Sequence, residues 1–368
     1  MSAFKLRSRS AWHGMIAKLA LLIFWFCIGA SAASAKPRLG PCDILQRAGT
    51  PCVAAHSTTR ALYASYAGPL YEIQRADGKI RNIGTLGAGG FADAAAQDAF
   101  CKGSTCTITR IFDQSPQRND LTIEGPGSAG KTADRGAQAD ALPVTLGGHR
   151  VYGIRIDMGM GYRNDTTHGV ARNGEPETML MVTSSFHTDA RCCFDYGNAE
   201  IDNTDHGPIS NGHMDALNFS RICKGKRTCL GDGPWVQADL ENGLFMSAQG
   251  GNDKSSYRGN PTPFVTALLK NDGRTFFELK SGDGQRGPLT QIYHGHEPLW
   301  KPGYSPMHQE GAIVLGTGGD NSNWSTGLFF EGFMTASVTS KATDDAIQAN
   351  IVAAGYRGLE NWAETVAQ

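Results

Sequence analysis

The chain has 368 residues, of which 40% are hydrophobic and 19% are charged, with 34 Lys and Arg against 35 Asp and Glu. This composition excludes a disordered chain and a coiled coil, because disorder needs low hydrophobicity with high net charge and a coiled coil needs sustained heptads. The formal net charge is −1 and no basic run is present. A nucleic-acid partner is therefore not expected, because binding to phosphates requires clustered Lys and Arg.

The first residues have the layout of a secretory signal. Four basic residues precede an apolar run at residues 19–29, small residues follow, and we expect cleavage after Ala35. An uncleaved membrane anchor is the alternative, but the run is shorter than the roughly 20 residues of a spanning helix. We expect a signal peptide at residues 1–35 and one domain at residues 36–368. The product would be secreted, either extracellular or periplasmic, with no membrane contact after cleavage.

Eight cysteines follow the signal segment and fall into four close pairs. Each pair brackets a short, turn-rich loop, so disulfides closed within each pair are the natural expectation for an exported protein. The sequence has no Cys-x-x-Cys or Cys/His cluster with zinc spacing, so no metal and no other cofactor is expected. The eight residues are Cys42, Cys52, Cys101, Cys106, Cys192, Cys193, Cys223 and Cys229.

The adjacent residues Cys192 and Cys193 allow two interpretations. Neighbouring side chains on an extended strand point to opposite faces, so each sulfur could have a separate partner. The other interpretation is a bond between the two neighbours. It is favoured because the remaining six cysteines pair off locally.

Short apolar or alternating runs between Gly, Asn, Asp and Pro clusters predict β-strands, in chain order, at residues 107–112, 179–183, 236–241, 264–269, 275–279, 312–315 and 328–334. A hairpin turn is expected at residues 271–273, where Gly273 supplies the positive φ. Helices are expected only at residues 92–100 and near the C-terminus, from about residue 343 to Gly355. Many short strands and little helix indicate an all-β, two-sheet sandwich or jelly roll.

One expected strand carries two carboxylates. Val236, Ala238 and Leu240 alternate with polar residues, so Asp239 and Glu241 would share the face opposite the core. A solvated strand face is the plain alternative. Aromatic residues on both sides of the segment favour a sugar-binding cleft instead.

A second carboxylate follows the strand at residues 312–315, in a Gly-rich loop that presents Asp320. Gly318 and Gly319 allow backbone to approach a ligand, although a simple tight turn is the alternative. Paired carboxylates in an exported β-protein suggest glycoside hydrolysis, in which one acid protonates the leaving oxygen and one carboxylate attacks or activates water. Phosphate-binding and Gly-x-Ser-x-Gly motifs are absent.

Eight stretches of the sequence match a family pattern, and several of them are long and unusual in composition. They are residues 41–43, 49–63, 111–115, 161–164, 192–200, 231–235, 239–242 and 319–323. Together they span about Pro41 to Tyr356, and they resemble the catalytic domain of glycoside hydrolase family 54 α-L-arabinofuranosidases. The resemblance implies a concanavalin-like β-sandwich. It also implies an exo-acting enzyme that releases terminal arabinofuranosyl residues from arabinoxylan, arabinan or derived oligosaccharides with retention of configuration.

The resemblance assigns two catalytic roles. Glu241, in Asp-Leu-Glu-Asn, is the expected nucleophile. Asp320, in Gly-Gly-Asp-Asn-Ser-Asn, is the expected general acid/base and must be protonated at the start of the reaction.

The resemblance also implies a set of sugar contacts. Asp239 and Asn242 would hydrogen-bond the sugar hydroxyls, and the backbone of Gly319 would lie near the sugar. Adjacent cysteines in this family form a vicinal disulfide in the sugar pocket, so Cys192 and Cys193 would form an apolar platform.

Two departures from the family pattern affect the expected substrates. Fungal members end in an arabinose-binding module, whereas this chain stops at Gln368, so we expect weaker attachment to polymers. A basic loop between Cys223 and Cys229 replaces an expected aromatic segment on the leaving-group side. We expect a monomer that acts on arabinofuranosyl-containing plant polysaccharides or oligosaccharides. The alternatives are a non-catalytic, lectin-like module on the same fold and a side activity on β-xylosides.

Overall fold

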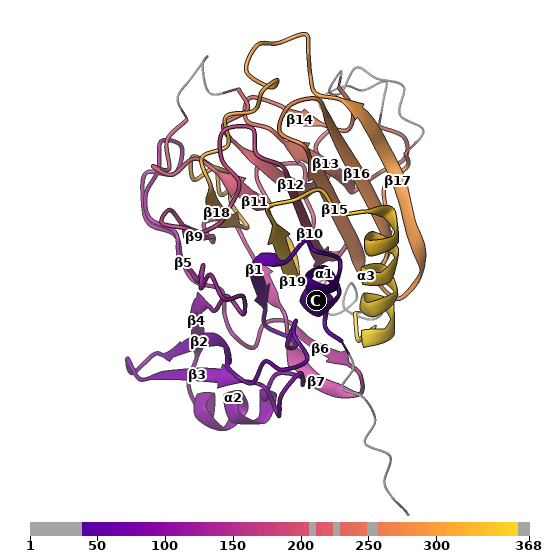
Figure 1. Cartoon of the computed structure of the whole chain (residues 1–368). Helices are drawn as coiled ribbons and strands as arrows, with labels where there is room; N and C mark the ends of the chain where they lie inside the picture. The colour runs from indigo at the N-terminus through magenta and orange to yellow at the C-terminus, as the bar shows by residue number, and fades with distance from the viewer. Residues whose placement is uncertain (1–38, 206–210, 224–228, 249–256, 360–368) are drawn as a thin grey trace, which may run out of the picture. The chain divides into compact units, whose positions relative to one another are not determined.

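The computed structural model describes residues 39–205, 211–223, 229–248 and 257–359. The expected signal peptide lies outside these residues, and the division into a signal peptide and one catalytic domain stays a prediction. All the described residues belong to one compact unit, residues 37–368. The strands of the described residues form two large antiparallel sheets and one small sheet (Figure 1).

Two antiparallel sheets form the sandwich. The seven-stranded sheet has, in spatial order, β1 (Cys52–Ser57), β19 (Gly327–Thr335), β10 (Glu177–Thr183), β15 (Val265–Asn271), β16 (Phe276–Asp283) and β17 (Arg286–His296), with β8 (Ile154–Ile156) beside β19. The ten-stranded sheet has the order β14 (Leu244–Phe245), β13 (Trp235–Asp239), β12 (Asp215–Ser220), β11 (Asp195–Ala199), β18 (Ala312–Leu315), β9 (Tyr162–Asn164), β5 (Leu121–Ile123), β4 (Cys106–Ile111), β2 (Pro69–Arg75) and β3 (Ile80–Gly84). A smaller sheet consists of β20 (Tyr356–Arg357), β6 (Pro143–Leu146) and β7 (His149–Tyr152).

The main hydrophobic core includes side chains from both large sheets. Tyr196 on β11 connects them, because its ring lies 5.4 Å from the ring of Phe329 on β19 and its hydroxyl lies 3.0 Å from Nδ1 of His56 on β1. Large aromatic side chains of this kind dominate core energetics and find a polar partner when buried. The expected two-sheet β-sandwich is confirmed.

The ten-stranded sheet also buries its other face. Side chains alternate along a strand, and the residues opposite the main core form a separate small apolar cluster of Ala199, Met214, Ala216, Ala312 and Val314. The same face of β11, β12 and β13 carries Asp195, Asn218 and Asp239. They share this face because Asp195 pairs with Asn218, and Asp239 pairs with Ala216, two residues before Asn218. The polar residues of this face provide the floor of the candidate site.

The three helices are short and lie at the ends of the described chain and beside the small sheet. Helix α3 (Lys341–Ala354) begins after the N-cap Ser340, whose side chain accepts a hydrogen bond from the amide of Thr343, and ends at Gly355 with φ 76°. The expected C-terminal helix is therefore confirmed, and Figure 1 shows it beside the long strand β17. The expected short helix is α2 (Ala94–Cys101).

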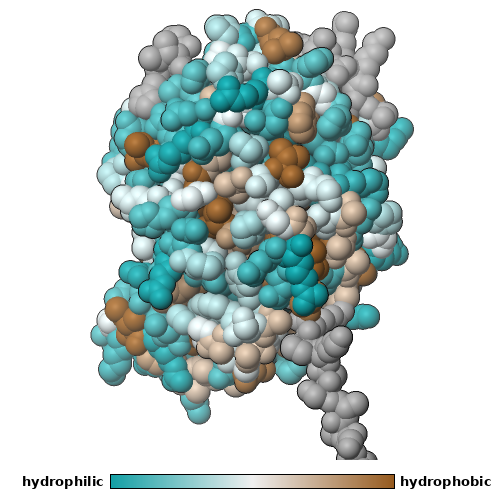
Figure 2. Space-filling model, in the orientation of Figure 1, coloured by the Kyte–Doolittle hydropathy of each residue, from teal (hydrophilic) through white to brown (hydrophobic). Residues whose placement is uncertain are grey.

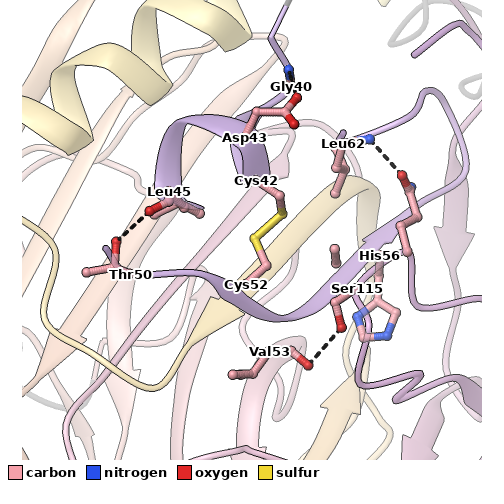
Figure 3. The surroundings of a disulfide bond; sticks show 12 residues. Gly40, Cys42, Asp43, Leu45, Thr50, Cys52, Val53, His56, Leu62 and Ser115 are labelled. Atoms are coloured by element: carbon pink, nitrogen blue, oxygen red, sulfur yellow. Dashed lines mark hydrogen bonds between the residues drawn. A yellow bond between two sulfur atoms is a disulfide. The ribbon is translucent and has the colours of Figure 1, made fainter. Parts of the chain in front are cut away.

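Helix α1 (Pro41–Arg47) is not predicted by our sequence analysis. It has only seven residues, with Pro41 at its first position, and the disulfide between Cys42 and Cys52 attaches it to β1 (Figure 3). Asp43 accepts a hydrogen bond from the amide of Gly40 at 2.8 Å. So short a helix depends on such tertiary and capping contacts rather than on its own propensity.

All four disulfides close within the expected sequence pairs. Cα separations are 5.6 Å for Cys42–Cys52, 5.8 Å for Cys101–Cys106 and 6.1 Å for Cys223–Cys229, within the usual range for disulfides. Cys192 is bonded to Cys193, the second of the two interpretations above. Four disulfides are typical of a protein that folds in an oxidising compartment.

Each expected strand has a counterpart, and the hairpin turn is also present. Asp272 Oδ1 accepts hydrogen bonds from the amides of Arg274, Thr275 and Phe276, and Gly273 has φ 75°. On the face in Figure 2, hydrophobic residues (brown) occur as small groups separated by polar ones. Among the described residues, no helix is both long and apolar enough to cross a membrane.

Candidate active site

Glu241 lies in a turn rather than in a strand. β13 ends at Asp239, and Glu241 and Asn242 have φ angles of 59° and 52°. The alternating pattern correctly places Val236 and Ala238 in the core, but the expected extension of the strand to Glu241 is wrong. Both faces of β13 are buried, so the solvated-face alternative is also wrong.

Contacts to both Glu241 and Asn242 help to hold this turn. The hydroxyl of the fully buried Tyr304 donates to the carbonyl of Glu241 at 2.7 Å. The amide of Glu241 donates to Asp239 Oδ1 at 3.3 Å, and Lys301 Nζ donates to the carbonyl of Asn242 at 3.2 Å. A left-handed conformation costs an ordinary residue about 1–2 kcal/mol, and surrounding contacts must over-determine it.

The Glu241 side chain lies among other carboxyl groups. It is 9% exposed and within hydrogen-bonding distance of the carboxyl of Glu200, which is fully buried. Burial raises the pKa of Glu241, and the negative charges of Glu200 and Asp239 raise it further. Burial also raises the pKa of Glu200, and burial together with the charge of Asp239 raises the pKa of Asp195. A group of this kind is typical of a functional site.

Asp320 lies on the loop that follows β18 and is the partly exposed carboxylate of the site. Its carbonyl accepts a hydrogen bond from the amide of Ala129 at 2.9 Å, and its Oδ1 accepts one from the amide of Ser322 at 3.1 Å. The preceding residue, Gly319, lies so close to Glu200 that a Cβ atom would overlap with the Glu200 carboxyl. Gly319 therefore lets the Asp320 loop approach the carboxyl group that contacts Glu241.

Arg163 on β9 fixes the backbone beneath this loop. Its Nη1 donates to the carbonyl of Gly319 at 2.7 Å, and its Nη2 donates to the carbonyl of Glu200. The side chain is only 3% exposed, and its guanidinium also contacts Glu124 at 3.4 Å, Asn203 Oδ1 at 3.2 Å and Asp165. Arginine suits this role because its guanidinium is planar, is always charged and offers several N–H donors.

The vicinal disulfide lies between β13 and the loop that carries Asp320. Cys193 Sγ lies 3.6 Å from Asp239 Oδ2 and 3.6 Å from Ser322 Oγ, and the amide of Cys193 donates to the carbonyl of Ser322 at 2.8 Å. Cys192 is partly exposed. The donor atoms of Cys192, Cys193 and Asp239 lie within 4.8 Å of one another, but the two sulfurs are bonded to each other and are not thiolate ligands.

The structure brings most of the expected site residues together. Cys193 and Asp239 are in direct contact, and Gly319 lies against the carboxyl that contacts Glu241. Asn242 is exposed.

Sequence reasoning assigned no role to Glu200, Asp195 or Arg163. Residues 192–200 and 161–164 do lie in the stretches that carry the family resemblance. Their contacts are tertiary, however, so those stretches alone do not show what the three residues do.

Residues 41–357 match a family model described as “Alpha-L-arabinofuranosidase B, catalytic”. The chain belongs to this arabinofuranosidase family. It is 47% identical over 90% of its length to a “Probable alpha-L-arabinofuranosidase B” of Aspergillus fumigatus, and 46% identical over 89% to an “Arabinofuranosidase/B-xylosidase” of Trichoderma koningii. A crystal structure of an arabinofuranosidase complexed with arabinofuranosyl-α-1,2-xylobiose superposes with a TM-score of 0.81 at 44% identity and covers 87% of this chain. The chain spans 65% of each curated relative and 66% of that solved chain.

Proposed function

We propose that the protein is an exo-acting, retaining α-L-arabinofuranosidase. The observation that carries the proposal is the meeting of two loops: the Glu241 turn and the Asp320 loop are joined through Glu200, Gly319 and the vicinal disulfide. One carboxylate is buried and the other is partly exposed. A glycosidase needs two carboxyl groups, one that attacks the sugar and one that protonates the leaving oxygen.

In the first step a carboxylate oxygen of Glu241 attacks the anomeric carbon, and the bond from that carbon to the leaving oxygen breaks. Asp320 gives its proton to the leaving oxygen. In the second step Asp320 takes a proton from water as the water oxygen attacks the anomeric carbon, and Glu241 leaves as a carboxylate. Two inversions give net retention.

The other expected contacts position the sugar. Asp239 and Asn242 flank Glu241 and would accept or donate hydrogen bonds to the hydroxyls of the ring. The disulfide between Cys192 and Cys193 would provide an apolar surface for the furanose, and the backbone at Gly319 allows the ring to approach Asp320. We propose that this site takes a single terminal arabinofuranosyl unit.

The substrates would be arabinofuranosyl-bearing plant polysaccharides and their oligosaccharides, because one similar solved enzyme binds arabinofuranosyl-α-1,2-xylobiose. A side activity on β-xylosides is the second candidate, because the relative from Trichoderma koningii has both activities in its name. A lectin-like role is disfavoured because a binding module has no need for both Glu241 and Asp320. The four disulfides support secretion.

The test is hydrolysis of 4-nitrophenyl α-L-arabinofuranoside by the wild type, Glu241→Gln and Asp320→Asn, with the anomer of the product followed by NMR. We expect retention in the wild type and a loss of kcat of at least about 10³-fold in Glu241→Gln. Asp320→Asn should keep partial activity on this good leaving group, and azide should raise it by giving an α-configured glycosyl azide.

Asp345→Asn is the matched control, because Asp345 is an exposed carboxylate on α3 and should leave kcat unchanged. Product with inverted configuration would contradict the double displacement. Binding of arabinofuranosides without turnover by the wild type would show a lectin instead.

A further inference from the structure

Glu200 is a buried carboxyl without an ordinary counterion. It follows β11 directly and is 0% exposed. No described side chain donates a hydrogen bond to its carboxyl oxygens, and the carboxyl that lies within hydrogen-bonding distance of them is that of Glu241. Arg163 donates to the backbone carbonyl of Glu200 and to Gly319 rather than to the Glu200 carboxyl.

Two carboxyl groups in contact cannot both be ionised at low cost, and a hydrogen bond between them requires one shared proton. A nucleophile must attack as the carboxylate, so Glu241 has to be the ionised member. The proton then belongs on Glu200. Burial explains why Glu200 keeps it, since moving an unpaired carboxylate out of water is costly.

We propose that Glu200 is a positioning residue that stays protonated and donates a hydrogen bond to Glu241, so that the nucleophile is both ionised and aimed at the anomeric carbon. The proposal rests on the function proposed above. The proton remains on Glu200 through both displacement steps. Because the same carboxyl lies against Gly319, it also sets the spacing between the Glu241 turn and the Asp320 loop.

The two carboxyls are coupled. Burial raises the pKa of both, so the pair keeps a proton that two separate, solvated carboxyls would release. The pair therefore titrates as a unit. The charged groups that act on it are Asp239 on β13, Arg163 on β9 and Asp205.

The experiment is the pH dependence of covalent labelling by an arabinofuranose-configured cyclic sulfate. Glu241 opens the ring by forming a bond to the anomeric carbon, while the anomeric C–O bond to sulfate breaks and the sulfate stays on the sugar as an anion. No proton is needed on the leaving oxygen. The rate therefore reports the state of the Glu200–Glu241 pair and not that of Asp320.

In the wild type we expect labelling to rise with pH as the pair loses its first proton and to fall again when Glu200 loses the second. Glu200→Gln keeps a hydrogen-bond donor that cannot ionise, so its maximal rate should stay within about fivefold of the wild type and the alkaline fall should disappear. Glu200→Ala removes the donor, and its rate should drop at least tenfold at every pH. Circular dichroism at each pH confirms that the variants are folded.

Glu124→Gln is the matched control. Glu124 is also a buried glutamate beside Arg163, but the contacts described for Glu241 do not include it, so this variant should keep the alkaline fall. An identical alkaline fall in Glu200→Gln would overturn the Glu200 proposal. If the wild type neither hydrolyses aryl arabinofuranosides nor labels at Glu241 by mass spectrometry, the proposed function fails instead.

Discussion

At the scale of single residues, the conformation of Glu241 is the feature on which the candidate site depends. An ordinary residue adopts positive φ only when neighbours hold it, and the hydroxyl of Tyr304 contacts the Glu241 carbonyl directly. The Tyr304 ring packs edge-on against Phe245, with centroids 5.3 Å apart. Tyr304 thus supports both ends of the short segment that carries the proposed nucleophile.

Tyr304→Phe should slow catalysis without weakening substrate binding. The ring packing remains, but a buried carbonyl loses its donor, which costs roughly 1–3 kcal/mol and loosens the turn. We expect kcat for 4-nitrophenyl α-L-arabinofuranoside to fall about tenfold, with KM within about twofold. Tyr162→Phe is the control, because Tyr162 is equally buried and its hydroxyl donates to the Ile108 carbonyl. An equal loss of kcat in the two variants would mean a general loss of stability and not positioning.

The sequence predicted Asp239, Glu241 and Asp320 through motif resemblance, but the role of Glu200 depends on a contact that no local pattern encodes. Alternation extends two residues beyond Asp239 in the sequence, although the strand does not. Periodicity describes which face a side chain takes if the strand continues. It does not show where tertiary contacts such as that of Tyr304 bend the backbone.

At the scale of elements, apolar strands were predictable and polar ones were not. Residues 312–315 and 179–183 are buried along their whole length and are apolar apart from Thr183. β11, with the sequence Asp-Tyr-Gly-Asn-Ala, has the composition of a turn. Asp195 faces the candidate site, and Asn198 donates hydrogen bonds to the Ala171 carbonyl and to Glu177. β17 is an exposed edge strand held by backbone pairing to β16, so its side chains show no burial pattern.

Helix α3 is attached to the seven-stranded sheet by a buried ion cluster. Asp344 is fully buried and lies 2.5 Å from Lys270 Nζ on β15 and 2.7 Å from Lys280 Nζ on β16. Glu278 is the second carboxylate for both lysines, at 3.0 and 3.1 Å. The two positive and two negative charges balance each other only while all four side chains are present.

Asp344→Ala should destabilise the protein by about 3–5 kcal/mol, because it leaves a buried ammonium group without its counterion. The measurement is the free energy of unfolding in urea. Asp345→Ala removes the neighbouring carboxylate, which is exposed and paired with the exposed Lys341, and should cost less than about 1 kcal/mol. Equal losses in the two variants would show that the cluster does not hold the helix.

At the scale of the whole molecule, buried carboxyl groups also lie between the two sheets. Glu177 begins β10 of one sheet and contacts Asp215, which begins β12 of the other. Burial raises the pKa of Asp215 to about 7 and, together with the charge of Asp215, the pKa of Glu297 to about 9. Burial likewise raises the pKa of Glu177. The sandwich therefore holds protons here that the unfolded chain, with its ordinary carboxyl pKa values, releases near pH 4.

The free energy of unfolding should consequently fall as pH rises from about 5 to about 9, by a few kcal/mol. In this window the folded state binds more protons than the unfolded state, so the slope of stability against pH is negative. Below the pKa that these carboxyls have in the unfolded chain, both the folded and the unfolded state are protonated, so stability no longer changes with pH through these groups. The double variant Asp215→Asn/Glu297→Gln cannot ionise at these positions and should show a flatter slope in urea unfolding at pH 5, 7 and 9. Glu175→Gln is the control, because it changes an exposed neighbour of Glu177 and should keep the wild-type slope. An unchanged slope in the double variant would mean that other groups cause the loss of stability at high pH.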